Sequence, residues 1–115
     1  MDELEAHEEG HRVVAVDLDG TLTNDDIYPK FGKPNREIVK MVEKEFENGS
    51  YLTLFTCRLN PDYSMNKASY RRALNNICDW LIEHDLIKYF ERVTGNKPFA
   101  DVYIDNKAQC SKCLK

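Results

Sequence analysis

Residues 13–22 read VVAVDLDGTL, and this stretch decides the fold. Its first four residues are apolar, which is typical of a central strand in a parallel sheet that is covered on both faces. The apolar run ends at Asp17 and Asp19, and Gly20 follows where the chain has to turn tightly. Because ligands bind at the carboxyl edge of an open parallel sheet, these carboxylates lie where a functional site is expected.

Three further strands are expected after this one. Residues 51–55 form a second apolar run that ends at Thr56. Residues 90–94 and 101–104 form two shorter runs, the second of which ends at Asp105. Helical patterns lie between the first and second strands and between the second and third. This alternation predicts a three-layer α/β/α fold of the Rossmann-like kind, with a small, mostly parallel sheet.

Two amphipathic helices are expected between the strands. The first begins after Asn35, which suits an N-cap, and stops at Gly49, whereas the second follows a polar loop around residues 60–62. Apolar residues recur at spacings of three and four on both helices, so one face of each is expected to be buried. These faces consist of Ile38, Met41, Val42 and Phe46 on the first helix, and of Tyr70, Ala73, Leu74, Ile77, Trp80 and Leu81 on the second.

The composition fits one soluble domain. The chain has 115 residues, of which 42% are hydrophobic and 31% charged, so it holds enough apolar material for a single core. Residues 1–11 are acidic and are expected to form a flexible tail, and residues 12–115 are expected to form the domain. The net charge of −4 disfavours nucleic acid and anionic membranes as partners, and no apolar run is long enough to span a membrane. We therefore expect a cytoplasmic protein.

The cysteines are expected to be reduced thiols, because disulfides are rare in cytoplasmic proteins. The spacing of the last two matches half of a zinc site, but no second pair of ligands accompanies it, so structural zinc is disfavoured. The four cysteines are Cys57, Cys78, Cys110 and Cys113.

The polar residues at the strand ends suit phosphoryl transfer. Asp17 and Asp105 offer the hard carboxylate oxygens that Mg²⁺ prefers, and Asp17 is also a competent nucleophile. Asp19 is placed to protonate the leaving oxygen and then to activate water. Thr56 and Lys97 can supply a hydroxyl group and a positive charge to the phosphoryl oxygens. The candidate substrate-binding residues are Gly20, Thr21, Thr56, Arg58 and Lys97.

Four short motifs resemble those of the haloacid-dehalogenase superfamily. VAVDLDGTL is similar to the first motif and FTCR to the second, while GNKPFADVYIDN places Lys97 and Asp105 where the third and fourth motifs have their lysine and acid. The resemblance covers residues 13–106 and implies a Mg²⁺-dependent phosphatase that forms an aspartyl-phosphate on Asp17. It also implies that Asp17, Asp105 and the backbone carbonyl of Asp19 ligate the metal, and that Asp19 is the general acid/base.

The chain departs from the usual pattern of this family at one residue, and it lacks the cap domain of the larger members. Asn106 follows Asp105 where a second acid is common, which bears on the strength of metal binding. Residues 21–35 and 56–97 leave no room for a cap domain, so the resemblance implies a capless member with an open site. Such a site suits a bulky substrate, or a homo-oligomer in which a neighbouring subunit serves as the lid. The expected substrate is a phosphorylated small molecule, such as a sugar phosphate or a nucleotide.

Three other functions fit part of the pattern. A phosphotransferase or phosphomutase would use the same aspartyl-phosphate and pass the phosphoryl group to an acceptor other than water. A weak or inactive domain of the same fold would serve as a binding module, which Asn106 alone favours. A receiver domain also combines acids with Thr and Lys, but its phosphorylated aspartate ends a later strand than its acid pair. The second strand here ends in Phe55 and Thr56, which is the wrong order for a receiver.

Overall fold

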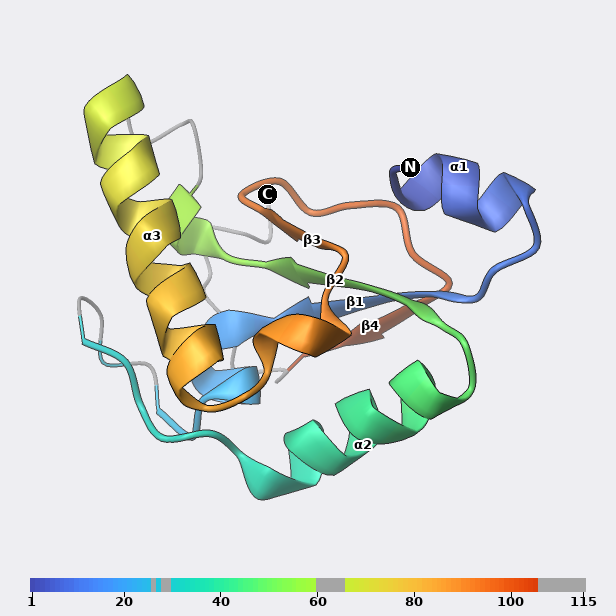
Figure 1. Cartoon of the computed structure of the whole chain (residues 1–115), viewed down its shortest axis with the longest axis horizontal. Helices are drawn as coiled ribbons and strands as arrows, with labels where there is room; N and C mark the ends of the chain where they lie inside the picture. Colours follow the sequence, from blue (N-terminus) through green and yellow to red (C-terminus); the bar gives the residue numbers. More distant parts are fainter. Residues whose placement is uncertain (26, 28–29, 60–65, 106–115) are drawn as a thin grey trace.

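Four short strands form the centre of the protein (Figure 1). The computed structural model describes residues 1–25, 27, 30–59 and 66–105 of the chain. The strands are β1 (Val13–Asp17), β2 (Tyr51–Phe55), β3 (Arg92–Thr94) and β4 (Val102–Ile104). They follow the order β3-β2-β1-β4 across the sheet, and every neighbouring pair is parallel. The expected α/β class with a small parallel sheet is thereby confirmed.

The strand order creates a topological switch point beside β1. The chain passes from β1 to β2 and β3 on one side and then returns to β4 on the other side of β1. Val16 lies in register with Leu54 of β2 and with Ile104 of β4, so these strands reach the same edge together. Ligands of open α/β sheets bind outside the carboxyl ends of the strands at such a point. The residues that follow β1, β2 and β4 therefore define the candidate site.

Helices cover both faces of the sheet (Figure 1). They are α1 (Glu3–Glu8), α2 (Arg36–Glu47) and α3 (Lys67–Glu83), and in the described part of the chain none is long and apolar enough to cross a membrane. Because side chains alternate along a strand, Val14 and Val16 enter the larger core that β1 shares with α2 and α3. Val13 points to the opposite face, where it packs with Tyr51 and with Ala6 of α1.

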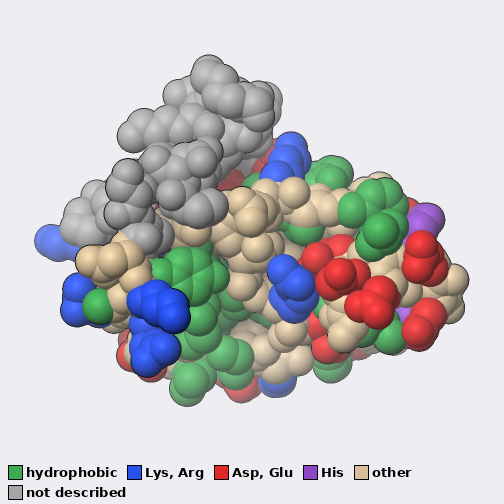
Figure 2. Space-filling model, turned by 90° about the horizontal axis from the view of Figure 1, so that it is seen from above, with side chains coloured by type: hydrophobic (Ala, Val, Ile, Leu, Met, Phe, Trp, Pro, Cys, Tyr) green, Lys and Arg blue, Asp and Glu red, His purple; other side chains and the backbone are tan. Residues whose placement is uncertain are grey.

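Helix α1 occupies a segment that was expected to be a flexible tail, and for this helix the expectation was wrong. Asp2 and Glu5 form a capping box, in which each carboxylate accepts a hydrogen bond from the backbone N–H of the other residue, at 2.9 and 3.0 Å. Buried Glu3 accepts a hydrogen bond from the Thr53 hydroxyl at 2.6 Å and lies 3.2 Å from Nε of Arg92. The acidic composition did not reveal these partners, because they come from the sheet. Other acidic side chains gather on the surface over α1 (Figure 2).

The helix boundaries agree with the sequence signals, but the buried stripes are narrower than expected. Asn35 caps α2, since its side-chain oxygen accepts hydrogen bonds from two backbone N–H groups of the first turn. Val42 is buried, whereas Met41 and Phe46 are 46% and 44% exposed, and Tyr70 in the first turn of α3 is 38% exposed. For these three residues the predicted burial was wrong. A sheet of four short strands contacts only a narrow arc of each helix, so the outer members of the apolar pattern stay at the rim.

Cys57 forms a disulfide, so the expectation that every cysteine is a reduced thiol was wrong. Cys57 follows β2 almost directly, and Cys78 on α3 is a free thiol. Cys110 and Cys113, whose spacing matches half of a zinc site, lie outside the described residues. Disulfide pairing depends on proximity in the fold, which cysteine spacing along the chain does not reveal.

Candidate active site

A wide turn directly after β1 fixes the backbone of the DLDGT sequence. Asp17 ends β1 and is 8% exposed. The turn that follows, η1 (Leu18–Leu22), is closed by a hydrogen bond from the Thr23 N–H to the Leu18 carbonyl at 2.9 Å. Gly20 has a φ of +79°, and its N–H donates to the Thr23 hydroxyl at 3.0 Å. The turn therefore requires the glycine of the motif, because side chains disfavour this backbone conformation.

Asp17 is buried and other acids are close to it. Burial raises the pKa of its carboxyl group from an ordinary value of 3.8 to about 7. Hydrogen bonds from the Leu18 N–H and the Thr21 hydroxyl oppose this rise, and the charges of Asp19 and Asp105 add to it. The Thr21 oxygen lies 3.3 Å from Oδ2 of Asp17. A nearby cation would favour the ionised form of this carboxyl group. A carboxyl group whose pKa is shifted by burial and by neighbouring charges is typical of a functional site.

The ends of β2 and β3 pack tightly together. Thr56 is buried, its N–H donates to the Thr94 carbonyl at 3.0 Å, and its hydroxyl accepts from the Arg58 N–H at 3.1 Å. A hydroxyl that accepts one hydrogen bond can also donate one, as a phosphate ligand must. Gly95 follows β3, and a Cβ there would lie only 2.0 Å from the carbonyl oxygen of Leu59. Sequence reasoning missed Gly95, although a glycine directly after an apolar strand was a usable signal.

Arg58, a predicted substrate ligand, is paired with Asp19. Its Nε and Nη2 donate to the two carboxylate oxygens of Asp19 at 2.8 and 2.7 Å. The two side chains are only 6% and 14% exposed, so the ion pair lies mostly away from water. Nη2 also donates to the Lys30 carbonyl, and the guanidinium lies 4.1 Å from the centre of the Phe31 ring. Substrate binding by Arg58 stays a prediction, and the sequence did not indicate its contact with Asp19.

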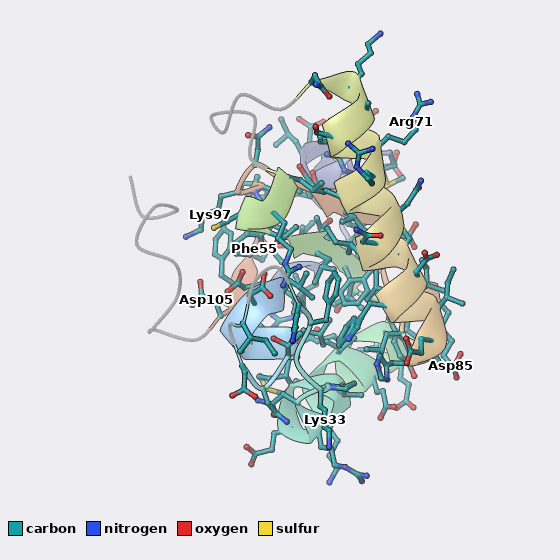
Figure 3. The ribbon with its side chains drawn as sticks, turned by 90° about the vertical axis from the view of Figure 1, so that its left-hand side faces the viewer. Lys33, Phe55, Arg71, Asp85, Lys97 and Asp105 are labelled. Carbon is teal, nitrogen blue, oxygen red and sulfur yellow. The ribbon has the colours of Figure 1, made fainter. Side chains whose placement is uncertain are left out.

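Lys97 and Asp105 lie on the same side of the molecule as Phe55, in a view onto the carboxyl edge of the sheet (Figure 3). Lys97 is exposed, and its ammonium group lies 4.8 Å from the centre of the Tyr103 ring. Asp105 follows β4, is half-buried, and acts electrostatically on Asp17. The structure thus brings Asp105 close to Asp17, while phosphate binding by Lys97 stays a prediction.

Asp101 lies at the opposite edge of the sheet, as its position before β4 predicts. Its carboxylate accepts from the Val13 N–H at 2.8 Å, and its own N–H donates to the Val13 carbonyl at 2.9 Å. Nδ1 of His7 lies 3.3 Å from the same carboxylate. These contacts connect the beginnings of β1 and β4 to α1, so Asp101 has a structural role.

The acids at the carboxyl edge suit a Mg²⁺ ion that keeps several of its waters. In the described ranges, no group of three or more His, Cys, Asp or Glu side chains is arranged to hold a metal. The expected ligand set is smaller, and consists of the carboxylates of Asp17 and Asp105 with the backbone carbonyl of Asp19. Mg²⁺ at phosphate-handling sites is commonly held by one or two carboxylates and water, so the donor chemistry fits. Asn106 lies outside the described residues.

Comparisons with known proteins assign no family to this site. Its interpretation therefore depends on the geometry described above and on the motifs of the sequence. No protein-family model, no curated protein and no solved structure matches the chain.

Proposed function

We propose that the protein is a Mg²⁺-dependent phosphohydrolase that cleaves a phosphomonoester through an aspartyl-phosphate on Asp17, as a capless member of the haloacid-dehalogenase superfamily. One observation carries this proposal, namely the convergence of acids at the switch point of the sheet. Asp17 ends the central strand in a buried position, and the charges of Asp19 and Asp105 act on it. Burying a carboxyl group beside other acids lowers the stability of the fold, so such an arrangement is expected at a functional site.

The position of each residue supports a distinct role. The carboxylate of Asp17 attacks phosphorus and takes the phosphoryl group, and the leaving oxygen receives a proton from Asp19. Asp19 then takes a proton from the water that hydrolyses the aspartyl-phosphate. The Thr56 hydroxyl and the Lys97 ammonium group bind the phosphoryl oxygens. Mg²⁺, held by Asp17 and Asp105, would supply the positive charge that offsets repulsion between carboxylate and phosphate.

The proposed substrate is a phosphorylated small molecule, such as a sugar phosphate or a nucleotide. The net charge of −4 makes a locally bound cation important for attracting such an anion. A cytoplasmic location belongs to the same proposal, and the disulfide at Cys57 is the observation that argues against it.

The test is phosphate release from a panel of phosphomonoesters, with Mg²⁺ and with EDTA, by the wild-type protein and by Asp17→Asn. Turnover is expected only with the metal, and the substitution is expected to lower it by at least roughly 10³-fold, because it removes the nucleophile. Asp79→Asn is the matched control, since Asp79 is an exposed aspartate on α3. It should leave turnover unchanged.

The other outcomes separate the rival functions. Transfer of the phosphoryl group to an added alcohol or sugar in preference to water would replace the hydrolase with a phosphotransferase. Phosphate binding without turnover of any ester would replace it with a binding module. Turnover that survives Asp17→Asn would refute the assignment of the nucleophile.

A further inference from the structure

A continuous line of side-chain contacts connects Asp19 with α3, and Arg58 lies at its centre. Both carboxylate oxygens of Asp19 accept hydrogen bonds from the guanidinium of Arg58. The same guanidinium donates to the carbonyl oxygen of Lys30 and lies over the ring of Phe31. The Phe31 ring is in turn stacked on Trp80 of α3, with 5.9 Å between the ring centres.

Residues 30–32, named the loop base below, are held from two sides. The indole N–H of Trp80 donates to the Gly32 carbonyl at 3.2 Å, while Arg58 contacts the two preceding residues. Arg58 belongs to η2 (Cys57–Leu59), directly after β2. The loop base is therefore attached both to α3 and to the carboxyl edge of the sheet.

The chemistry of Arg58 suits an orienting role. A guanidinium that is 6% exposed has lost most of its hydration, and hydrogen bonds and charge pairing must replace it. Its planar fork meets both oxygens of Asp19, which fixes the plane of the carboxylate as well as its position. A lysine ammonium carries the same charge but lacks this fork. The residue type thus matters for the direction in which Asp19 points.

We propose that Arg58 is a positioning residue that orients the carboxylate of Asp19, and that this orientation depends on the contacts of Arg58 with the loop base. This inference rests on the proposed function for the acid/base role of Asp19. The contacts from Asp19 through Arg58 and the loop base to Trp80 do not depend on that function. A change at Arg58 or in the loop base therefore alters proton transfer to the leaving group. Binding of the phosphoryl group by Thr56 is left intact.

The first test measures the contacts without any substrate. Trp80 is the single tryptophan of the chain, so its fluorescence reports on the loop base. Arg58→Lys and Asp19→Ala are both expected to shift the Trp80 emission to the red and to raise its quenching by acrylamide, because the loop base loosens. Phe31→Ala removes the stacked ring and is the positive control. Arg71→Ala changes an exposed arginine of α3 (Figure 3) and should have no effect.

Two results of this test would overturn the proposal. The first is an unchanged Trp80 signal in Arg58→Lys and Asp19→Ala, together with a clear change in Phe31→Ala. The second is a change that occurs in Arg58→Lys alone, which would mean that Arg58 holds the loop independently of Asp19. If Arg58→Lys does not fold, as judged by circular dichroism, the nearly isosteric Asp19→Asn weakens the same pair from the other side and takes its place.

The second test uses the dependence of the rate on the leaving group. An alkyl phosphate needs a proton on its leaving oxygen, whereas the ester of an acidic phenol does not. Asp19→Ala is expected to lower the rate of the first turnover, in which the alcohol or phenol is released, by about 10²-fold or more for the alkyl ester and by much less for the aryl ester. Arg58→Lys should show the same preference with KM unchanged, and the double variant should lose no more than Asp19→Ala alone.

The outcomes separate this proposal from the proposed function. An equal rise in KM for both esters, with kcat retained, would make Arg58 a substrate ligand and overturn the positioning role. Additive losses in the double variant would also overturn it, since Arg58 would then act independently of Asp19. If the wild-type protein turns over neither ester, the proposed function fails. The Trp80 measurement still tests whether Asp19 and Arg58 hold the loop base.

Discussion

Substitution of Asp17 by asparagine is expected to stabilise the metal-free protein at neutral and alkaline pH. Asp17 is 8% exposed, and burial raises the pKa of its carboxyl group to about 7. Asparagine has nearly the same shape, and its side-chain oxygen can still accept the hydrogen bond from Thr21. It carries no charge. The change therefore removes the cost of a buried carboxylate without leaving a cavity.

The sign and size follow from the two pKa values of Asp17. Below pH 3.8 the carboxyl group is protonated in the folded and the unfolded chain, and its ionisation costs nothing. Between pH 3.8 and about 7 the unfolded chain releases the proton while the folded chain retains it, so stability falls by about 1.4 kcal/mol per pH unit. Above pH 7 the full cost is reached, at most about 4 kcal/mol. Water penetration lowers the cost of a buried charge, so a gain of about 2 to 4 kcal/mol is expected for Asp17→Asn.

The assay is urea unfolding in EDTA between pH 4 and pH 8.5, followed by the fluorescence of Trp80. The stability difference between Asp17→Asn and the wild-type protein should be near zero at pH 4, rise through pH 7 and then stay constant. Asp79→Asn is the control for a carboxylate on an exposed helix surface, and a change within about 0.5 kcal/mol is expected there. An Asp17→Asn protein that is less stable than the wild type at pH 8 would refute the reasoning. So would a difference that does not vary between pH 4 and pH 7.

Two further predictions concern the contacts that hold the site and the sheet. Gly95→Ala should destabilise the protein by about 1 to 3 kcal/mol in urea unfolding, because the new methyl group would overlap the Leu59 carbonyl. If this variant is as stable as the wild-type protein, β3 and η2 can move apart freely. Glu3→Ala should cost about 1 to 3 kcal/mol, because the buried Thr53 hydroxyl loses its acceptor, whereas Glu8→Ala on the exposed side of α1 should cost little. Equal effects of the two glutamate substitutions would mean that α1 does not depend on its contact with the sheet.

The strands that build the site could be predicted because their signal is local. Residues 13–16 and 51–55 are continuous apolar or β-prone runs, and both strands lie in the middle of the sheet, where both of their faces are covered. Parallel pairing then brings their carboxyl ends to one edge, whatever the details of packing. The position of Asp17 at that edge follows from these two facts. By the same argument Asp101, which precedes β4, lies at the other edge.

The features that could not be predicted depend on contacts between distant parts of the chain. The composition of residues 1–11 indicates a solvated tail, whereas α1 is held by contacts with the sheet, such as the hydrogen bond that Glu3 accepts from the Thr53 hydroxyl, 50 positions away. Met41 and Phe46 fit the helical spacing but lie beyond the narrow arc that the sheet covers. The disulfide at Cys57 likewise depends on which thiol comes near it in the folded chain.

The two aspartates of the DLDGT sequence are held by different means. Asp17 belongs to β1 and lies in register with Phe55, so the backbone hydrogen bonds of the sheet fix its Cα. Asp19 lies within the turn after β1, and its carboxylate takes its direction from Arg58, 39 positions later in the chain. A motif of five residues therefore specifies the identity and position of both acids but the direction of only one. In the proposed reaction the nucleophile is placed by the sheet, whereas the acid/base group is oriented by side chains. Substitution at Arg58 or in the loop base can therefore change proton transfer to the leaving group while the nucleophile stays in position.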